Sequence, residues 1–335
     1  MPPPGERDSS NPSLRMNGLP PSNPIGLDCF RQLFEDYHER WEKQELVVQV
    51  ADCDSKNRME ARDGRVFHFY PELFLQIQGT TVFTTPEQEV TVGPGQAAIV
   101  PAGVPHSEKI YDEETRKFGN LVVAFFNGNV SIHLAREVQP GVPALVERYL
   151  FQSDYFVPLV DNLELVASLH STPAARAREA KMGILGGVFN LLLDIMSTDA
   201  VGEANDSVKV VESKWAISEN LSNPDLSVAF LSERLGCNPN YLSRLFHQKT
   251  GEKLTDYITK TRLRNAMESL VETERSIKDV ARICGFSDPN YFARVFRQYI
   301  GLSPHAYRKH EWSLLEKVRI CCDPCEGCPP VNSDL

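Results

Sequence analysis

The chain has 335 residues, of which 41% are hydrophobic and 24% are charged. This composition is typical of a folded protein with room for two domains, and it excludes a wholly disordered or collagen-like chain. We find no run of roughly 18 to 20 apolar residues, so we expect no membrane span. The first residues lack the basic and apolar regions of a secretory signal, and four cysteines stand singly, so we predict a cytoplasmic protein.

The charge is unevenly distributed. The whole chain has a net charge of -10, but residues 208–320 carry 18 Lys and Arg against 13 Asp and Glu, a local charge of +5. Residues 1–207 carry -12. A positive C-terminal part suits an anionic partner and the acidic part does not, so we expect the two parts to do different work.

Residues 1–25 are rich in Pro, Ser and Asn, and we predict a disordered arm. Phe30–Tyr37 has the pattern of a short amphipathic helix. From about 45 to 135, short apolar runs recur between glycines and prolines, from Leu46–Val50 to Val130–Leu134. Many short strands at this spacing predict a β-sandwich or barrel.

Helical periodicity is predicted over Ala144–Leu150 and Ile184–Met196. The run from Ile184 to Ile195 is a candidate dimer contact, with packing on its own barrel as the equal alternative. The predicted divisions of the chain are an arm at 1–25, a barrel at 26–140, a helical dimerisation or packing segment at 141–199, a linker at 200–207, a helical domain at 208–320 and a tail at 321–335.

An internal repeat with an offset of 50 residues is the most informative feature. Pro239–Gly251 and Pro289–Gly301 are identical at seven of thirteen positions. In each copy an Asn or Asp precedes the proline, which is typical of a helix start, and a glycine stands where the helix would end. Shorter helices are predicted before each copy, over Val228–Leu235 and Ile277–Ile283. Helix, glycine-containing turn and helix form the helix-turn-helix pattern.

The second helix of each copy has an apolar face and a polar face. Leu242, Leu245 and Phe246 form the apolar stripe of the first copy, and the equivalent positions do so in the second. The polar face fits the DNA major groove, which is about 12 Å wide and in which Arg and Asn read guanine and adenine edges. The candidate DNA-binding residues are Asn240, Ser243, Arg244, His247, Asn290, Arg294 and Arg297.

Ala293 stands where the first copy has Ser243, so we expect the second helix to read fewer bases and to rely more on phosphates. A helix over Asp256–Val271, about 24 Å long, would join the two units. The alternative is a helical domain whose polar faces are merely solvated. Further candidate phosphate contacts are Lys249, Lys253, Lys260, Arg262, Arg264, Lys278, Arg282 and Lys309.

Residues of about 208–310 resemble the DNA-binding domain of the AraC/XylS family of bacterial transcription regulators. The resemblance is carried above all by the run from Ser276 to Phe296 and by the run from Gly301 to Arg308, which are similar to the family signature almost position for position. It implies an all-α domain with two helix-turn-helix units joined by a linker helix. It also implies double-stranded DNA as partner, a homodimer on direct repeats, and RNA polymerase as a further partner.

Gly95–His106 resembles the second cupin motif, Gly-x5-Pro-x-Gly-x2-His, whereas the first cupin motif is incomplete. The resemblance implies an N-terminal cupin-like β jelly roll with flanking helices. AraC/XylS regulators commonly carry such an effector domain, which implies a small polar effector such as a sugar. The candidate effector-binding residues are His68, Tyr70, Glu72 and His106, with Phe74 or Phe83 as an apolar wall.

A metal site needs three or four ligands at fixed geometry, and the candidates here are His68, Glu72 and His106. We predict no metal and no cofactor in the barrel; a bound metal and a purely structural barrel are the alternatives. Cys321–Cys328 contains a Cys-x2-Cys-x2-Cys run. We predict a flexible thiol-rich tail there, with a zinc or iron–sulfur site as the alternative.

Taken together, these patterns predict a ligand-responsive, sequence-specific DNA-binding regulator that is not an enzyme. One alternative is a constitutive DNA-binding protein whose barrel only dimerises. The other is a cupin-type metalloenzyme with a helical appendage, which needs a fuller ligand set than the sequence offers.

Overall fold

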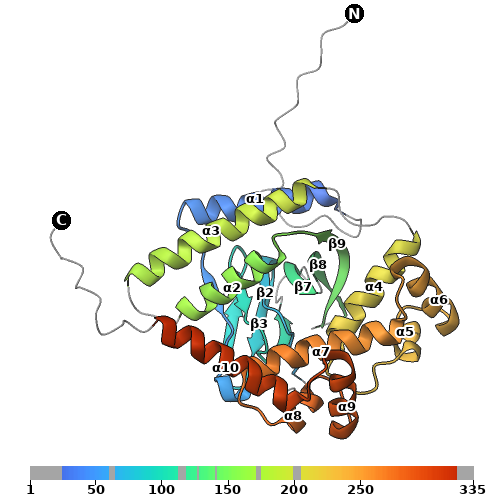
Figure 1. The fold of residues 1–335 in the computed structure, drawn as a ribbon. Helices are drawn as coiled ribbons and strands as arrows, with labels where there is room; N and C mark the ends of the chain where they lie inside the picture. Colours follow the sequence, from blue (N-terminus) through green and yellow to red (C-terminus); the bar gives the residue numbers. More distant parts are fainter. Residues whose placement is uncertain are drawn as a thin grey trace, which may run out of the picture. The chain divides into compact units, whose positions relative to one another are not determined.

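The computed structural model divides into two compact units, the N-terminal unit Met1–Val208 and the C-terminal unit Lys209–Leu335 (Figure 1). The first is rich in sheet and the second is helical, which confirms the predicted two-domain layout. Most of the predicted arm and tail lies outside the described residues. The structure describes residues 25–59, 65–111, 118–126, 128–139, 142–170, 175–198 and 205–322.

Two sheets build the N-terminal unit. The larger has the strand order β1-β5-β2-β7-β8-β9 and the smaller the order β4-β3-β6. Among the described residues, neighbouring strands pair antiparallel, except that β1 pairs parallel with β5. The strands are β1 Val48–Val50, β2 Glu72–Gln78, β3 Thr80–Thr84, β4 Glu89–Val92, β5 Ala97–Val100, β6 Ser107–Tyr111, β7 Gly119–Phe126, β8 Asn129–Gln139 and β9 Val142–Gln152, with a short 3-10 helix, η2, over Ser55–Asn57.

Three helices cover one face of the larger sheet: α1 Leu27–Glu42, α2 Phe156–His170 and α3 Ala175–Ser197. In Figure 1, α1 and α3 lie side by side, in blue and yellow-green. Because side chains alternate along a strand, Leu73 and Leu75 of β2 face these helices while their neighbours face the smaller sheet. The apolar core therefore lies between the larger sheet and the helices.

The second face of the larger sheet is packed against the smaller sheet. The ring centroids of Phe74 on β2 and Phe83 on β3 are 4.7 Å apart. The Thr81 hydroxyl of β3 donates a hydrogen bond of 2.7 Å to Gln76 Oε1 of β2. An aromatic contact and a side-chain hydrogen bond thus join the two sheets across a buried inner face.

The helix predicted over Ala144–Leu150 is wrong, because this segment is part of β9. β9 pairs along its length with β8, so that Tyr149 stands opposite Ile132 and Arg148 opposite His133. A short apolar run does not distinguish a helix from a strand by periodicity alone. Val66–Phe69 is one of the short apolar runs that predict strands between Leu46 and Leu134, and it forms an isolated bridge at Val66 rather than a strand.

α3 covers the helix predicted over Ile184–Met196. Its apolar residues Leu185, Phe189 and Leu192 are fully buried in the core of their own unit. The structure therefore favours packing on the unit's own sheet over the dimer contact for this run. Within the described residues, α3 is also long and apolar enough to cross a membrane by length and composition, a test that buried core helices also pass.

In residues 205–322, which the structure describes without a gap, seven helices follow. The first, α4, starts at Asn205, inside the predicted linker. α5 and α6 form the first helix–turn–helix, α8 and α9 the second, and α7 joins them. The helices are α4 Asn205–Glu219, α5 Val228–Arg234, α6 Pro239–Thr250, α7 Leu254–Glu272, α8 Ile277–Ile283, α9 Pro289–Ile300 and α10 Pro304–Cys322.

The repeat extends into the packing of the C-terminal unit. Phe246 of α6 makes an edge contact with Tyr257 of α7, at a centroid distance of 5.2 Å. Fifty residues later, Phe296 of α9 makes the same contact with Tyr307 of α10, at 5.6 Å. Each second helix is thus fixed by the same aromatic pair to the helix that follows it.

Candidate nucleic-acid interface and a buried polar cluster

Both second helices begin on a side-chain cap and a proline. Asn238 Oδ1 accepts hydrogen bonds from the backbone N–H of Asn240 and of Tyr241, at 2.9 and 3.4 Å. Asp288 Oδ1 accepts one from the backbone N–H of Asn290 at 2.8 Å. These bonds satisfy donors that a helix start leaves unpaired. Each helix then ends at a left-handed glycine, Gly251 or Gly301.

The two helices bury and expose the same positions. Residues 241–250 and 291–300 have an identical sequence of exposed, half-buried and buried residues. Leu242, Leu245 and Phe246 are buried in α6, and the equivalent residues are buried in α9. Both predicted apolar stripes therefore pack inward, which leaves the opposite stripes at the surface.

The predicted DNA-binding residues occupy those surface stripes. Six of them are exposed: Asn240, Arg244, His247, Asn290, Arg294 and Arg297. Ser243 and its counterpart Ala293 are half-buried. Because residues three, four and seven apart share one face of a helix, each set forms a single polar ridge.

Two tyrosines at the same positions were not among the predicted residues. Tyr241 is 37% exposed and Tyr291 46% exposed. The Arg294 guanidinium lies over the Tyr291 ring, 5.4 Å from its centroid, which holds the guanidinium at the start of α9. The sequence repeat indicates them, because both copies have a tyrosine at this position, next to the polar face.

Arg262 is not placed to bind phosphate. Its Nε donates to Leu221 O at 3.2 Å and its Nη2 to Asn223 O at 2.6 Å, so the guanidinium braces the loop between α4 and α5. Burial lowers the pKa of Arg262. Lys260 Nζ forms an ion pair with Glu252 Oε1 at 2.6 Å, so a carboxylate of the protein itself already partners this predicted phosphate contact.

In the N-terminal unit, three of the four predicted effector residues converge. Glu72 Oε2 lies 3.7 Å from His68 Nε2 and 3.8 Å from His106 Nε2. Tyr70 does not join them: its ring packs on Phe156 of α2, on the helix-covered side of the sheet, at 5.3 Å. Phe83, one of the two predicted wall residues, lies 6.3 Å from the His106 ring.

His106 is held in one orientation. Its Nδ1 is 3.0 Å from Val104 O, and since a carbonyl only accepts, Nδ1 carries the proton and Nε2 the lone pair. His106 is 1% exposed, and its Nε2 has no hydrogen-bond partner. Burial, and secondarily the neighbouring His68, lowers the pKa of His106 to about 4. The same cause lowers the pKa of His133, on the same inner face, to about 3.

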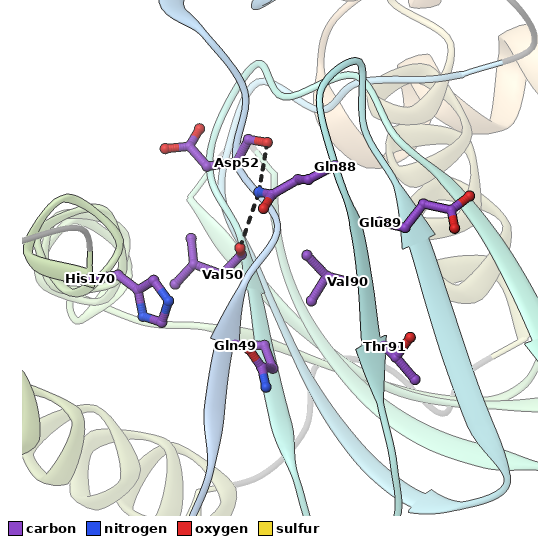
Figure 2. Close-up of a pocket in the computed structure, with 8 residues that line it drawn as sticks. All are labelled: Gln49, Val50, Asp52, Gln88, Glu89, Val90, Thr91 and His170. Atoms are coloured by element: carbon purple, nitrogen blue, oxygen red, sulfur yellow. Dashed lines mark hydrogen bonds between the residues drawn. The ribbon is translucent and has the colours of Figure 1, made fainter.

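A pocket of about 280 Å³ opens elsewhere in the unit, between β1, β4 and the end of α2 (Figure 2). Figure 2 shows the Gln88 side chain reaching across it, where its Nε2 donates to Asp52 O at 3.0 Å and to Val50 O at 3.4 Å. His170 lines its opposite side. The predicted effector residues do not line this pocket.

Parts of this chain are similar in sequence to known proteins. A family model described as a helix-turn-helix domain matches residues 231–310. The transcriptional regulatory protein YesN of Bacillus subtilis is 36% identical over 34% of this chain and 32% of its own length. The Msm operon regulatory protein of Streptococcus mutans is 22% identical over 74% of this chain and 85% of its own length.

A solved structure, the DNA-binding domain of the transcriptional factor AdpA with a target DNA, is 28% identical. The match covers 35% of this chain and 96% of the chain in that structure, with a TM-score of 0.29. The chain spans about a third of the length of YesN.

The C-terminal unit therefore contains a helix-turn-helix domain of the class found in transcription regulators. The matched residues include the run from Ser276 to Phe296, which resembles the signature of the AraC/XylS family. The family model does not extend to the N-terminal unit.

Proposed function

We propose that the chain regulates transcription by binding specific DNA sites with α6 and α9. The observation that carries this proposal is the matched pair of surface ridges, each with an arginine at the same position, Arg244 and Arg294. The local charge of +5 in residues 208–320 favours the phosphate backbone as partner. The similarity to regulatory proteins favours this function over that of an enzyme.

The two ridges have different reading capacity. Asn240, Ser243 and Arg244 offer three polar readers on α6. On α9 the central position is Ala293, and Arg294 is stacked on Tyr291. We therefore expect α6 to specify more base pairs than α9. His247 and Arg297 occupy the same place one turn further along, where a side chain reaches base edges or phosphates according to the depth of insertion.

Selection of bound sequences from a random duplex pool with the full chain tests the proposal. Arg244→Ala and Arg294→Ala should each weaken binding to the selected site by about 1 to 3 kcal/mol and relax the preference at one position. Arg178→Ala, an exposed arginine of α3, is the matched control because it removes the same charge outside the interface. Unchanged site affinity in both interface variants would refute the assignment of these faces.

For the N-terminal unit we propose a cupin-like jelly roll that takes a small polar effector, such as a sugar, on the inner face between its sheets. This face is rich in buried polar groups, among them Glu72, Gln76, Asn120 and Ser131. Both polar atoms of the Asn120 amide are buried without a hydrogen-bond partner. Such a group is costly to leave unsatisfied, and a polar ligand would satisfy it.

Thermal shift of the full chain against a panel of polar metabolites tests the effector. A ligand should raise the melting temperature, and Asn120→Leu should abolish that shift while leaving the unliganded chain at least as stable, because it removes an unpaired buried amide. If no metabolite stabilises the chain, the constitutive alternative stands instead.

A homodimer and contact with RNA polymerase belong to the same proposal. A dimer would place two pairs of ridges on a repeated site, and an effector would act by favouring one arrangement of the pair. Sedimentation of the full chain with and without selected DNA measures the stoichiometry. A single chain per complex on every site would exclude the dimer.

A further inference from the structure

Two arginines of the C-terminal unit lie over aromatic rings that also contact each other. Arg262 of α7 lies over Phe286, 5.8 Å from the centroid of its ring. Arg294 of α9 lies over Tyr291 at 5.4 Å. The centroids of the Phe286 and Tyr291 rings are 6.4 Å apart, within the range of aromatic pairs. A row of guanidinium, ring, ring and guanidinium therefore runs from α7 to the exposed side of α9.

We propose that Tyr291 is a positioning residue, which fixes the Arg294 guanidinium for reading one base pair and thereby sets the sequence preference of α9. This inference rests on the proposed DNA binding by α9 and names a residue on which its specificity depends. The tyrosine acts through the arginine and needs no contact of its own with a base.

The inner end of the row is anchored. Phe286 is buried, and its ring also packs against Phe292 at a centroid distance of 5.1 Å. The Arg262 guanidinium on Phe286 donates hydrogen bonds to two backbone carbonyls. Because Phe286 and Arg262 are both held by these contacts, the Tyr291 ring rests on a fixed support.

The outer end of the row keeps its hydrogen-bond donors. In the part of the chain that the structure describes, the Arg294 guanidinium makes no hydrogen bond and no ion pair. Arg262, in contrast, uses its Nε and Nη2 on Leu221 O and Asn223 O. A ring face attracts a guanidinium without taking up its N–H groups. Tyr291 therefore restricts Arg294 and leaves available the fork that pairs with a guanine edge.

Such a restraint acts on specificity more than on total affinity. An unrestrained arginine has many rotamers, so it can reach a phosphate or a neighbouring base instead of the intended one. Holding the side chain before DNA arrives lowers the ordering cost of the one reading geometry. Tyr291 and Arg294 are three residues apart on α9, the spacing at which side chains on a helix meet.

The sequence gives this role more weight in the second unit than in the first. Directly after the turn glycine the second copy has Phe286, whereas the first copy has Cys237 and therefore no ring at that place. The second copy also has Ala293 where the first has the polar reader Ser243. A larger share of the specificity of α9 thus falls on one arginine, and on the ring that orients it.

The test compares Tyr291→Leu with Tyr291→Phe in the full chain. Arg294→Ala first identifies the base pair of the selected site whose preference depends on this arginine. At that base pair, Tyr291→Leu should lower the discrimination against the other bases about 2- to 5-fold, the worth of a cation–π contact at an exposed site. Tyr291→Phe keeps the ring face and should retain the discrimination. In the Arg294→Ala background, Tyr291→Leu should have no further effect on that base pair.

A second readout needs no DNA. In the full chain labelled with ¹⁵N-arginine, the Arg294 Nε–H resonance should shift in Tyr291→Leu, which removes the ring current, and should keep its position in Tyr291→Phe. Tyr299→Leu is the matched control, because Tyr299 also lies on α9 and is 41% exposed, and it should change neither readout. Circular dichroism shows whether each variant folds, and Tyr291→Gln replaces Tyr291→Leu should the leucine variant not fold.

Two results would overturn the inference alone. One is selection of a defined site by the wild-type chain together with unchanged discrimination in Tyr291→Leu. The other is a loss in Tyr291→Phe as large as that in Tyr291→Leu, which would assign the effect to the hydroxyl group. A wild-type chain that selects no sequence from the random pool would instead overturn the proposed function, and this inference with it.

Discussion

Gly285, in the turn between α8 and α9, lies directly against the Arg262 guanidinium of α7. A Cβ at this position would stand 2.8 Å from Arg262 Nε and would collide with Leu221 O. The same guanidinium bonds Leu221 O and Asn223 O. The turn of the second helix-turn-helix is thus packed onto the loop that leads into the first, and the two reading units share one brace.

Gly285→Ala should destabilise the C-terminal unit by about 2 kcal/mol or more, because it adds a steric clash to a left-handed backbone of φ 79°. Gly236 occupies the equivalent turn of the first unit with φ 59° and no atom within 4 Å of the added Cβ. Gly236→Ala should therefore cost only the backbone term of about 1 to 2 kcal/mol. Urea denaturation of both variants measures the difference, and equal losses would show that the contact with Arg262 is immaterial.

Arg262→Lys and Arg262→Ala separate a structural role from phosphate binding. The fork of the guanidinium reaches two carbonyls, which an ammonium does not reproduce, so both variants should lower the free energy of unfolding by about 1.5 to 3 kcal/mol. The salt dependence of DNA binding should be unchanged in both. A slope reduced by about one in the alanine variant alone would instead place Arg262 on a phosphate.

How far the sequence predicts the molecule depends on how local each signal is. The caps Asn238 and Asp288, the apolar stripes and the terminal glycines act within one or two turns, so the sequence alone places both helix-turn-helix units. The segment Ala144–Leu150 has the sequence pattern of a helix, yet it is part of β9 because pairing with β8, rather than its own periodicity, fixes its conformation.

The same distinction applies to the sites. Arg262 looked like one more surface cation, since nothing in the sequence shows that Leu221 and Asn223 turn their carbonyls toward it. Tyr70 is two residues from His68 in the sequence, yet its ring does not lie in the polar cluster. It packs against Phe156 of α2, on the helix-covered side of the larger sheet. Long-range packing decides both cases.

Cys284 should resist alkylation. It is fully buried, and burial raises the pKa of its thiol, so the reactive thiolate is scarce near neutral pH. Cys237, partly exposed in the turn of the first unit, should react with iodoacetamide at least tenfold faster. Mass spectrometry of peptides after timed labelling measures both rates. Comparable alkylation rates of Cys284 and Cys237 in the folded chain would contradict the burial of Cys284.

Adjacent glycines of α3 should respond in opposite directions to the same substitution. A Cβ at Gly186 would collide with the Trp41 ring of α1, whose Nε1 donates to Met182 O at 2.7 Å. Gly186→Ala should therefore destabilise the N-terminal unit by about 1 to 3 kcal/mol through overpacking. Gly187 is exposed with no atom within 4 Å of an added Cβ, so Gly187→Ala should stabilise by about 0.5 to 1 kcal/mol.

Calorimetric melting of the two alanine variants shows the sign of each effect. Adding Trp41→Phe to Gly186→Ala should recover part of the loss, because the smaller ring vacates the space that the methyl group needs. No recovery would mean that Gly186 is required for the backbone of α3 rather than for the close approach of α1. Destabilisation by Gly187→Ala would show that this exposed position is covered in solution, since a bare helix surface gains from the exchange of glycine for alanine.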